Sequence, residues 1–133
     1  MKWGRIAGFS FLLLILHAGL GVLLSAIPEA PYTRARMWLL WLPHFGPPLL
    51  AAVVFFWLGL IQRERLLLHA VCVMVLQALA AFLVIVGIER LMHAPPAPAD
   101  PTAALDMALT IVGALFGLAL GFRVRQPLPV KHT

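Results

Sequence analysis

Residues 66–88 read LLLHAVCVMVLQALAAFLVIVGI and contain no charged side chain. A helix needs about 20 predominantly apolar residues to cross a hydrocarbon core about 30 Å thick, and this stretch is long enough to do so. Three further apolar stretches cover residues 6–27, 37–61 and 103–122. Inside lipid, helices and closed barrels satisfy every backbone hydrogen bond, and these stretches lack the alternation of barrel strands. The sequence therefore predicts an all-α membrane protein, a bundle of four transmembrane helices.

The composition agrees with a chain that is almost entirely membrane-embedded. Of its 133 residues, 62% are hydrophobic and 11% are charged, and the mean hydropathy is +0.98. The Lys and Arg residues lie at the ends of the apolar stretches, which favours contact with membrane lipids over binding of nucleic acid. We expect one transmembrane domain over residues 1–125 and a disordered tail over 126–133. The predicted helices span about 6–27, 37–61, 66–90 and 101–122.

The basic residues also predict the orientation of the chain. Seven of the ten lie near the two termini or the turn between the second and third helices: Lys2, Arg5, Arg63, Arg65, Arg123, Arg125 and Lys131. The other side of the membrane has Arg34, Arg36 and Arg90. The positive-inside rule therefore places the N and C termini in the cytoplasm. Because the turn at 62–65 is tight, we expect the second and third helices to be antiparallel neighbours.

Proline interrupts the second apolar stretch. The segment Pro43-His44-Phe45-Gly46-Pro47-Pro48 has three prolines in six residues, and each removes a backbone donor and crowds the preceding turn. A break in the outer third of this helix is expected. It is either a kink near the interface or a re-entrant element that lines a wet cavity. Further along, Asp100 and Pro101 are predicted to be the N-cap and first position of the fourth helix.

Small residues form a stripe on the fourth stretch. Gly113, Gly117 and Gly121 make two overlapping Gly-x-x-x-Gly steps, which let another helix approach closely. This pattern predicts helix packing, and the partner is either another helix of the chain or a second protomer. The single cysteine, Cys72, is expected to be a small core residue.

Polar residues at membrane depth are costly unless they have partners. His17 and Gln77 lie at matching depths on different helices, so we expect a hydrogen bond between them. A haem would require two histidines at matched depth, and His44 and His69 both differ from His17 in depth. No cofactor and no metal site are therefore expected.

Three polar residues from different helices should lie near the outer interface: His44, Glu89 and Asp106. A carboxylate at Asp106 is favoured by the N-terminal end of the helix dipole. Glu89 lies at a C-terminal end and needs a partner such as Arg90, Arg34 or Arg36. These residues form either a structural ion pair or a working polar site. No set of catalytic residues is recognisable, so the sequence favours a role other than catalysis.

At these positions the chain resembles the VanZ-like family, small bacterial membrane proteins named for a glycopeptide-resistance member. The matching positions run across residues 40–121: His44-Phe45, Glu89, Asp106 with Thr110 in place of an Asn, and Gly113 to Gly117. The chain departs from the family at Pro48, where an aromatic residue is usual, at Met92, where a Gln is usual, and in the 94–101 loop, which lacks an Arg.

The resemblance implies a bacterial inner-membrane protein of the cell envelope, a family without a settled biochemical activity. Our first hypothesis is that the chain has an outward-facing polar pocket for an envelope-linked or amphiphilic molecule. The alternative is a non-catalytic accessory or assembly subunit, which would form a homo-oligomer or part of a larger membrane complex. The glycine stripe and the scarcity of ionisable groups favour this alternative. A proton-coupled transporter working as a dimer is less favoured, because no charged residue lies at mid-depth.

Overall fold

The computed structural model describes residues 3–27, 37–62, 64–93 and 101–126, and within these ranges the secondary structure is entirely helical. Four α-helices follow one another: α1 (Trp3–Ser25), α2 (Met37–Ile61), α3 (Leu66–Met92) and α4 (Ala103–Arg125). Each is long and apolar enough to cross a membrane. A helix of 23 residues, the shortest length here, extends about 34 Å. The predicted four-helix membrane fold is confirmed.

The helix boundaries differ from the predicted ones by a few residues at several ends. Helix α4 begins at Ala103 with Thr102 as its N-cap, and the amide of Asp106 donates to the carbonyl of Thr102 at 2.9 Å. The prediction that Pro101 is the first helical residue is therefore wrong, and Asp100 lies outside the described residues. The predicted disordered tail also lies outside them from residue 127 onward.

Helix α2 runs continuously through the three prolines, so a re-entrant element with residues 37–42 as a separate piece is not present. Pro43, Pro47 and Pro48 all lie inside the helix. Proline keeps a helical φ, and its cost is a missing donor and a crowded carbonyl one turn earlier. Prolines are tolerated in transmembrane helices where neighbouring side chains bind the backbone groups. The carbonyls that lose their donor are those of Leu39, Pro43 and His44, four residues before each proline. The ring of His17, on α1, contacts a different carbonyl of this helix, that of Pro47.

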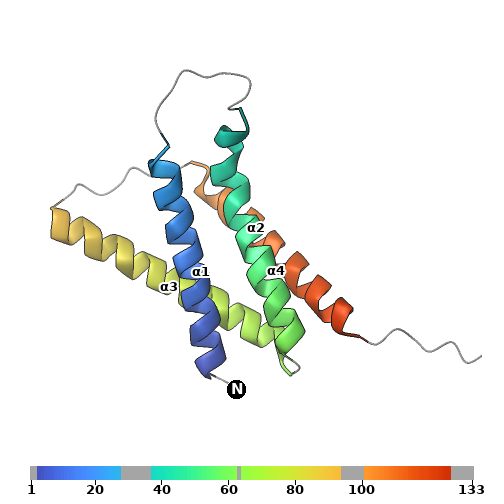
Figure 1. Ribbon diagram of the computed structural model, residues 1–133. Coiled ribbons are helices and arrows are strands. Elements are labelled where there is room, and N and C mark those ends of the chain that lie inside the picture. The colour runs from blue at the N-terminus through green and yellow to red at the C-terminus, as the bar shows by residue number, and fades with distance from the viewer. Residues whose placement is uncertain (1–2, 28–36, 63, 94–100, 127–133) are drawn as a thin grey trace, which may run out of the picture.

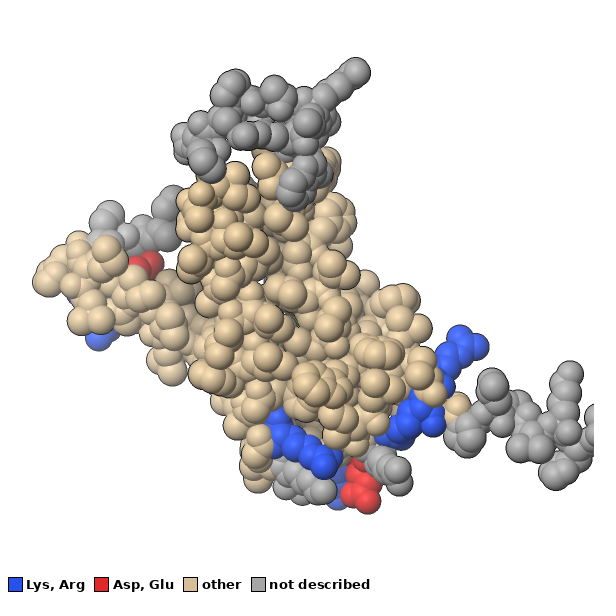
Figure 2. All heavy atoms as spheres, viewed as in Figure 1, with Lys and Arg blue, Asp and Glu red and all other residues tan. Residues whose placement is uncertain are grey.

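The two ends of the bundle differ, and we name each end by the chain segments that lie there. The termini side holds Trp3, the turn after Gln62 and the end of α4 at Arg125, and the loop side is the opposite end. Figure 2 shows Lys and Arg gathered along the lower edge of the molecule, which is the termini side in that view, with a smaller group at the far end of α3. Because the described helices number four, Trp3 and Arg125 lie on the same side.

Helices α2 and α4 form the most extensive contact, and α1 packs on both α2 and α3. The predicted α2–α3 neighbours touch only slightly, because α3 lies mainly against α1. Figure 1 shows α3 diverging from the other helices towards the loop side. Its loop-side half exposes large apolar residues, of which Leu83 is 67% exposed.

The buried core lies in the half of the bundle nearer the termini. All four helices contribute to it at or beyond their midpoints on that side: Ile6, Leu13, Ala51, Val54, Phe55, Leu58, Ala70, Val73, Ala114 and Leu118. Cys72 is half-buried and packs against this cluster, in keeping with its expected role. The loop-side half of the bundle is correspondingly more open.

The glycine stripe of α4 packs against the backbone of α2. A Cβ added to Gly113, Gly117 or Gly121 would meet the carbonyl oxygen of Pro48, Ala52 or Phe56, respectively, inside van der Waals contact. Residue numbers rise together on the two helices in steps of four, so α2 and α4 run parallel. The sequence left open whether the stripe packs on a helix of the same chain or on a second protomer, and the helix is α2 of the same chain. The contact brings the two backbones together for at least two turns.

Candidate functional site at the loop side

A histidine and a carboxylate meet near the loop-side ends of α2 and α4. The Nδ1 atom of His44 lies 2.8 Å from Oδ1 of Asp106. The two side chains are 36% and 27% exposed, so the pair is accessible from outside the bundle. Nδ1–H of His44 can donate to the carboxylate, and in a neutral imidazole with this tautomer Nε2 is an acceptor.

The packing of the two parallel helices positions this pair. His44 lies one turn before Pro48, whose carbonyl contacts Gly113, and Asp106 lies two turns before Gly113 on α4. Because glycine permits close backbone approach, two short polar side chains can bridge the helices. Asp106 also stands in the first turn of α4, where the helix dipole favours a carboxylate.

Two threonines complete the surroundings of Asp106. The hydroxyl of Thr102 donates to Oδ2 at 3.3 Å, so both carboxylate oxygens have a hydrogen-bond partner. Thr110 donates its hydroxyl to the backbone carbonyl of Asp106 at 2.8 Å. Thr110 is thus bonded within its own helix and does not reach the His44–Asp106 pair through this bond.

Glu89 and Arg90 lie on a different part of the molecule. Both belong to the loop-side end of α3, where the amide of His93, in the left-handed conformation, caps the helix by bonding to their carbonyls. Glu89 is half-buried and Arg90 is exposed. Figure 1 shows this end of α3 well apart from the loop-side ends of α2 and α4. The structure therefore joins His44 with Asp106 and places Glu89 and Arg90 elsewhere.

A second polar group links three helices at mid-depth. Nε2 of Gln77 lies 3.4 Å from Nδ1 of His17, and Nε2 of His17 lies 3.3 Å from the carbonyl of Pro47. These distances fit a neutral imidazole that accepts from the amide and donates to the carbonyl. The expected His17–Gln77 bond is present. The α2 carbonyl was not foreseen, because a backbone acceptor has no sequence signal.

Sequence reasoning also missed a polar cluster on the termini side. Nη1 of Arg125 donates to the carbonyls of Gln62 at 2.6 Å and Gly59 at 3.5 Å. Nη1 of Arg5 donates to the Gln62 side chain at 3.3 Å. Arg125 thus binds the last carbonyls of α2, where a cation is favoured by the helix dipole. The available signal was an Arg at the same membrane level as the end of α2.

Each histidine inside the described helices has a definite hydrogen bond. His17 and His44 bond as above, and Nδ1 of the fully buried His69 lies 3.1 Å from the carbonyl of Arg65. Of the three, His44 combines exposure with a carboxylate partner.

Comparison with family models, curated proteins and solved structures found no match to this chain. The likeness to the VanZ-like family therefore rests on the residues quoted above.

Proposed function

We propose that this chain is a VanZ-like multi-pass protein of the bacterial inner membrane, with both termini cytoplasmic. Its His44–Asp106 pair binds the polar head of an envelope-linked or amphiphilic molecule in the outer leaflet. The observation that supports this function is the 2.8 Å contact between two partly exposed polar side chains from separate helices. Such a contact holds both groups in place and leaves one imidazole nitrogen for a ligand.

The chemistry of the pair favours a head group that carries hydrogen-bond donors. A neutral His44 offers Nε2 as an acceptor, and Asp106 contributes a negative charge. Hydroxyl and ammonium groups can donate to both Nε2 of His44 and the carboxylate of Asp106, whereas a trimethylammonium head has no N–H to donate. The ligand we propose is an amphiphile with a hydroxyl-rich or primary-ammonium head, whose tail lies among the exposed apolar side chains nearby.

Lipid-dependent thermal stability tests this function directly. Short-chain phosphatidylethanolamine, which has an ammonium donor, should raise the Tm of the solubilised protein more than short-chain phosphatidylcholine does. His44→Ala and Asp106→Asn should remove the difference between the two lipids. An equal response of the unsubstituted protein to both lipids would rule out recognition through donors.

The orientation is tested separately by reporter fusions. Fusions after residues 30 and 98 should report the outside, and fusions after residues 64 and 133 the inside, because the basic residues are distributed seven to three. A cytoplasmic signal from the fusion after residue 98 would contradict the outward-facing site.

The second candidate is an accessory or assembly subunit of a membrane complex. It is supported by the loop-side half of α3, which Figure 1 shows apart from the other helices and where Phe82, Leu83 and Ile85 are each more than half exposed. This surface would be buried in a complex. Native mass spectrometry of gently solubilised protein distinguishes the two: a lone monomer with bound lipid supports the first function, and a defined stoichiometric complex supports the second.

A further inference from the structure

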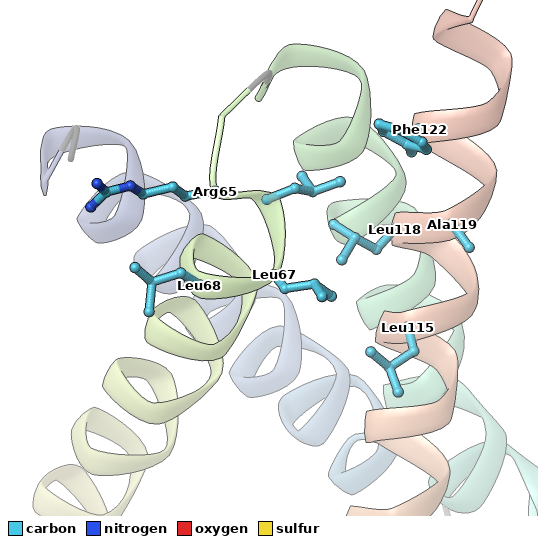
Figure 3. A pocket seen from close by; sticks show the side chains of 8 residues that line it. Arg65, Leu67, Leu68, Leu115, Leu118, Ala119 and Phe122 are labelled. Carbon is cyan, nitrogen blue, oxygen red and sulfur yellow. The ribbon is translucent and has the colours of Figure 1, made fainter.

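We propose a binding site for an anionic phospholipid in the groove between α3 and α4, in the leaflet on the termini side. The groove has a volume of about 750 Å³ and opens to the outside of the bundle. Seven apolar residues and Arg65 line it: Leu66, Leu67, Leu68, Leu115, Leu118, Ala119 and Phe122 (Figure 3). This site is at the opposite end of the molecule from His44 and Asp106, and it does not depend on the function proposed for them.

The length of the groove matches one leaflet. Its α4 wall runs from Leu115 to Phe122, a rise of about 10 Å. One half of a hydrocarbon core is about 15 Å thick, so an acyl chain can lie along this wall. A transmembrane helix from a second copy would cross the whole core and would use only a fraction of its length here. The dimensions therefore favour a lipid tail.

The charges at the mouth of the groove select an anionic head. Arg123 is exposed and follows Ala119 by four residues, which puts it one turn beyond Ala119 on the same face of α4. The guanidinium of Arg125 lies 5.5 Å from the centre of the Phe122 ring, which lines the groove. Arg125 also binds the end of α2, so Arg123 is the principal phosphate ligand.

Arg65 contributes less to the head-group contact. Figure 3 shows its side chain directed away from α4, although the residue borders the groove. An acyl chain here replaces other lipid contacts, so it gains little free energy from leaving water. The preference therefore comes from the head group, and one basic residue near the surface gives about a fivefold preference for an anionic lipid.

Native mass spectrometry with defined lipids tests the site. Full-length protein in dodecyl maltoside is mixed with dioleoylphosphatidylglycerol or dioleoylphosphatidylcholine, and bound lipid is counted. We expect one phosphatidylglycerol, bound about fivefold more tightly than phosphatidylcholine. Arg123→Gln should abolish this preference and Arg123→Lys should retain most of it. His44→Ala should leave it unchanged, which separates this site from the one on the loop side.

A bulky substitution that fills the groove provides a second test. Ala119→Trp should displace the lipid, whereas Ala108→Trp, the same change at an exposed α4 position outside the groove, should not. If Ala119→Trp does not fold, the Arg123 variants decide the question. Equal binding of both lipids to the unsubstituted protein overturns the proposal. It is also overturned if Ala119→Trp keeps the preference, or if the protein is a dimer that Ala119→Trp dissociates.

Discussion

The two halves of the bundle use helix packing differently. On the termini side, four helices share a buried core and the glycines of α4 lie on the α2 backbone. On the loop side, α3 diverges and the His44–Asp106 pair remains partly exposed. Buried apolar contact and close backbone approach give stability, whereas accessible polar groups give recognition. We therefore expect stability to respond to substitutions at the core and the glycine contact, and the site at the loop side to respond to substitutions of His44 and Asp106.

The largest effect is expected from Gly117→Leu on the termini side. Its Cβ would overlap the backbone of Ala52, including the carbonyl carbon and Cα at 2.7 and 2.8 Å. Overpacking against backbone cannot be relieved by a rotamer change, so we expect a loss of about 3 kcal/mol or more. The loss is measured as a fall in Tm of the solubilised protein, followed by tryptophan fluorescence.

Gly19→Leu is the matched control for this prediction. Gly19 is exposed on α1 and has no atom within 4 Å of an added Cβ. The same substitution there should leave the Tm nearly unchanged. Equal destabilisation at both positions would mean that close approach of α2 and α4 contributes little.

A smaller loss is expected from Arg125→Gln at the end of the same interface. The change removes charged hydrogen bonds to the carbonyls of Gln62 and Gly59. For a half-buried arginine we expect about 1 kcal/mol. Arg123→Gln, measured in phosphatidylcholine micelles without anionic lipid, is the control and should have little effect. If both variants behave alike, the loss reflects net charge and the α2 cap is unimportant.

The mid-depth contact between His17 and Gln77 should contribute less to stability than Arg125 does. His17→Ala and Gln77→Ala each remove the 3.4 Å contact between these side chains, and hydrogen bonds inside membranes average about 0.6 kcal/mol. A double-mutant cycle in Tm should therefore give a coupling energy near this value. Strictly additive losses would mean that the two side chains act independently.

The smallest effect on stability is expected on the loop side. His44→Ala and Asp106→Asn alter a partly exposed pair outside the buried core, so each should lower stability by about 0.5 kcal/mol or less. The response to phosphatidylethanolamine should nevertheless disappear. A large fall in Tm without a change in lipid response would make this pair a structural clamp between α2 and α4.

The sequence predicts the number and type of elements well, because the length and polarity of each apolar stretch follow from the thickness of the membrane. It also locates the contact surface of α4, since Gly113, Gly117 and Gly121 recur at helical spacing. It is less informative at α2, where local proline rules left a kink and a re-entrant element open, whereas the helix runs continuously through Pro43, Pro47 and Pro48. Propensity describes an isolated segment, and α2 is not isolated.

The candidate site shows a different limit. Membrane depth can be read from position in the chain, so His44, Glu89 and Asp106 were expected at one level. Depth does not determine lateral distance, and the divergence of α3 separates Glu89 from the other two. The roles of Arg125 and the Pro47 carbonyl depend on which helices are neighbours, and that arrangement is a property of the whole bundle.

The parallel pairing of α2 with α4 has a consequence for biogenesis. Ala52 and Gly117 meet in the finished protein, yet 65 residues separate them along the chain (117 − 52). At about 5–20 residues per second, a ribosome needs roughly 3–13 seconds to synthesise that interval. During this time α2 is in place without α4, and α3 must cross back before α4 can be inserted. The partnerless face of α2 is the part of the nascent chain that an insertion factor would need to shield.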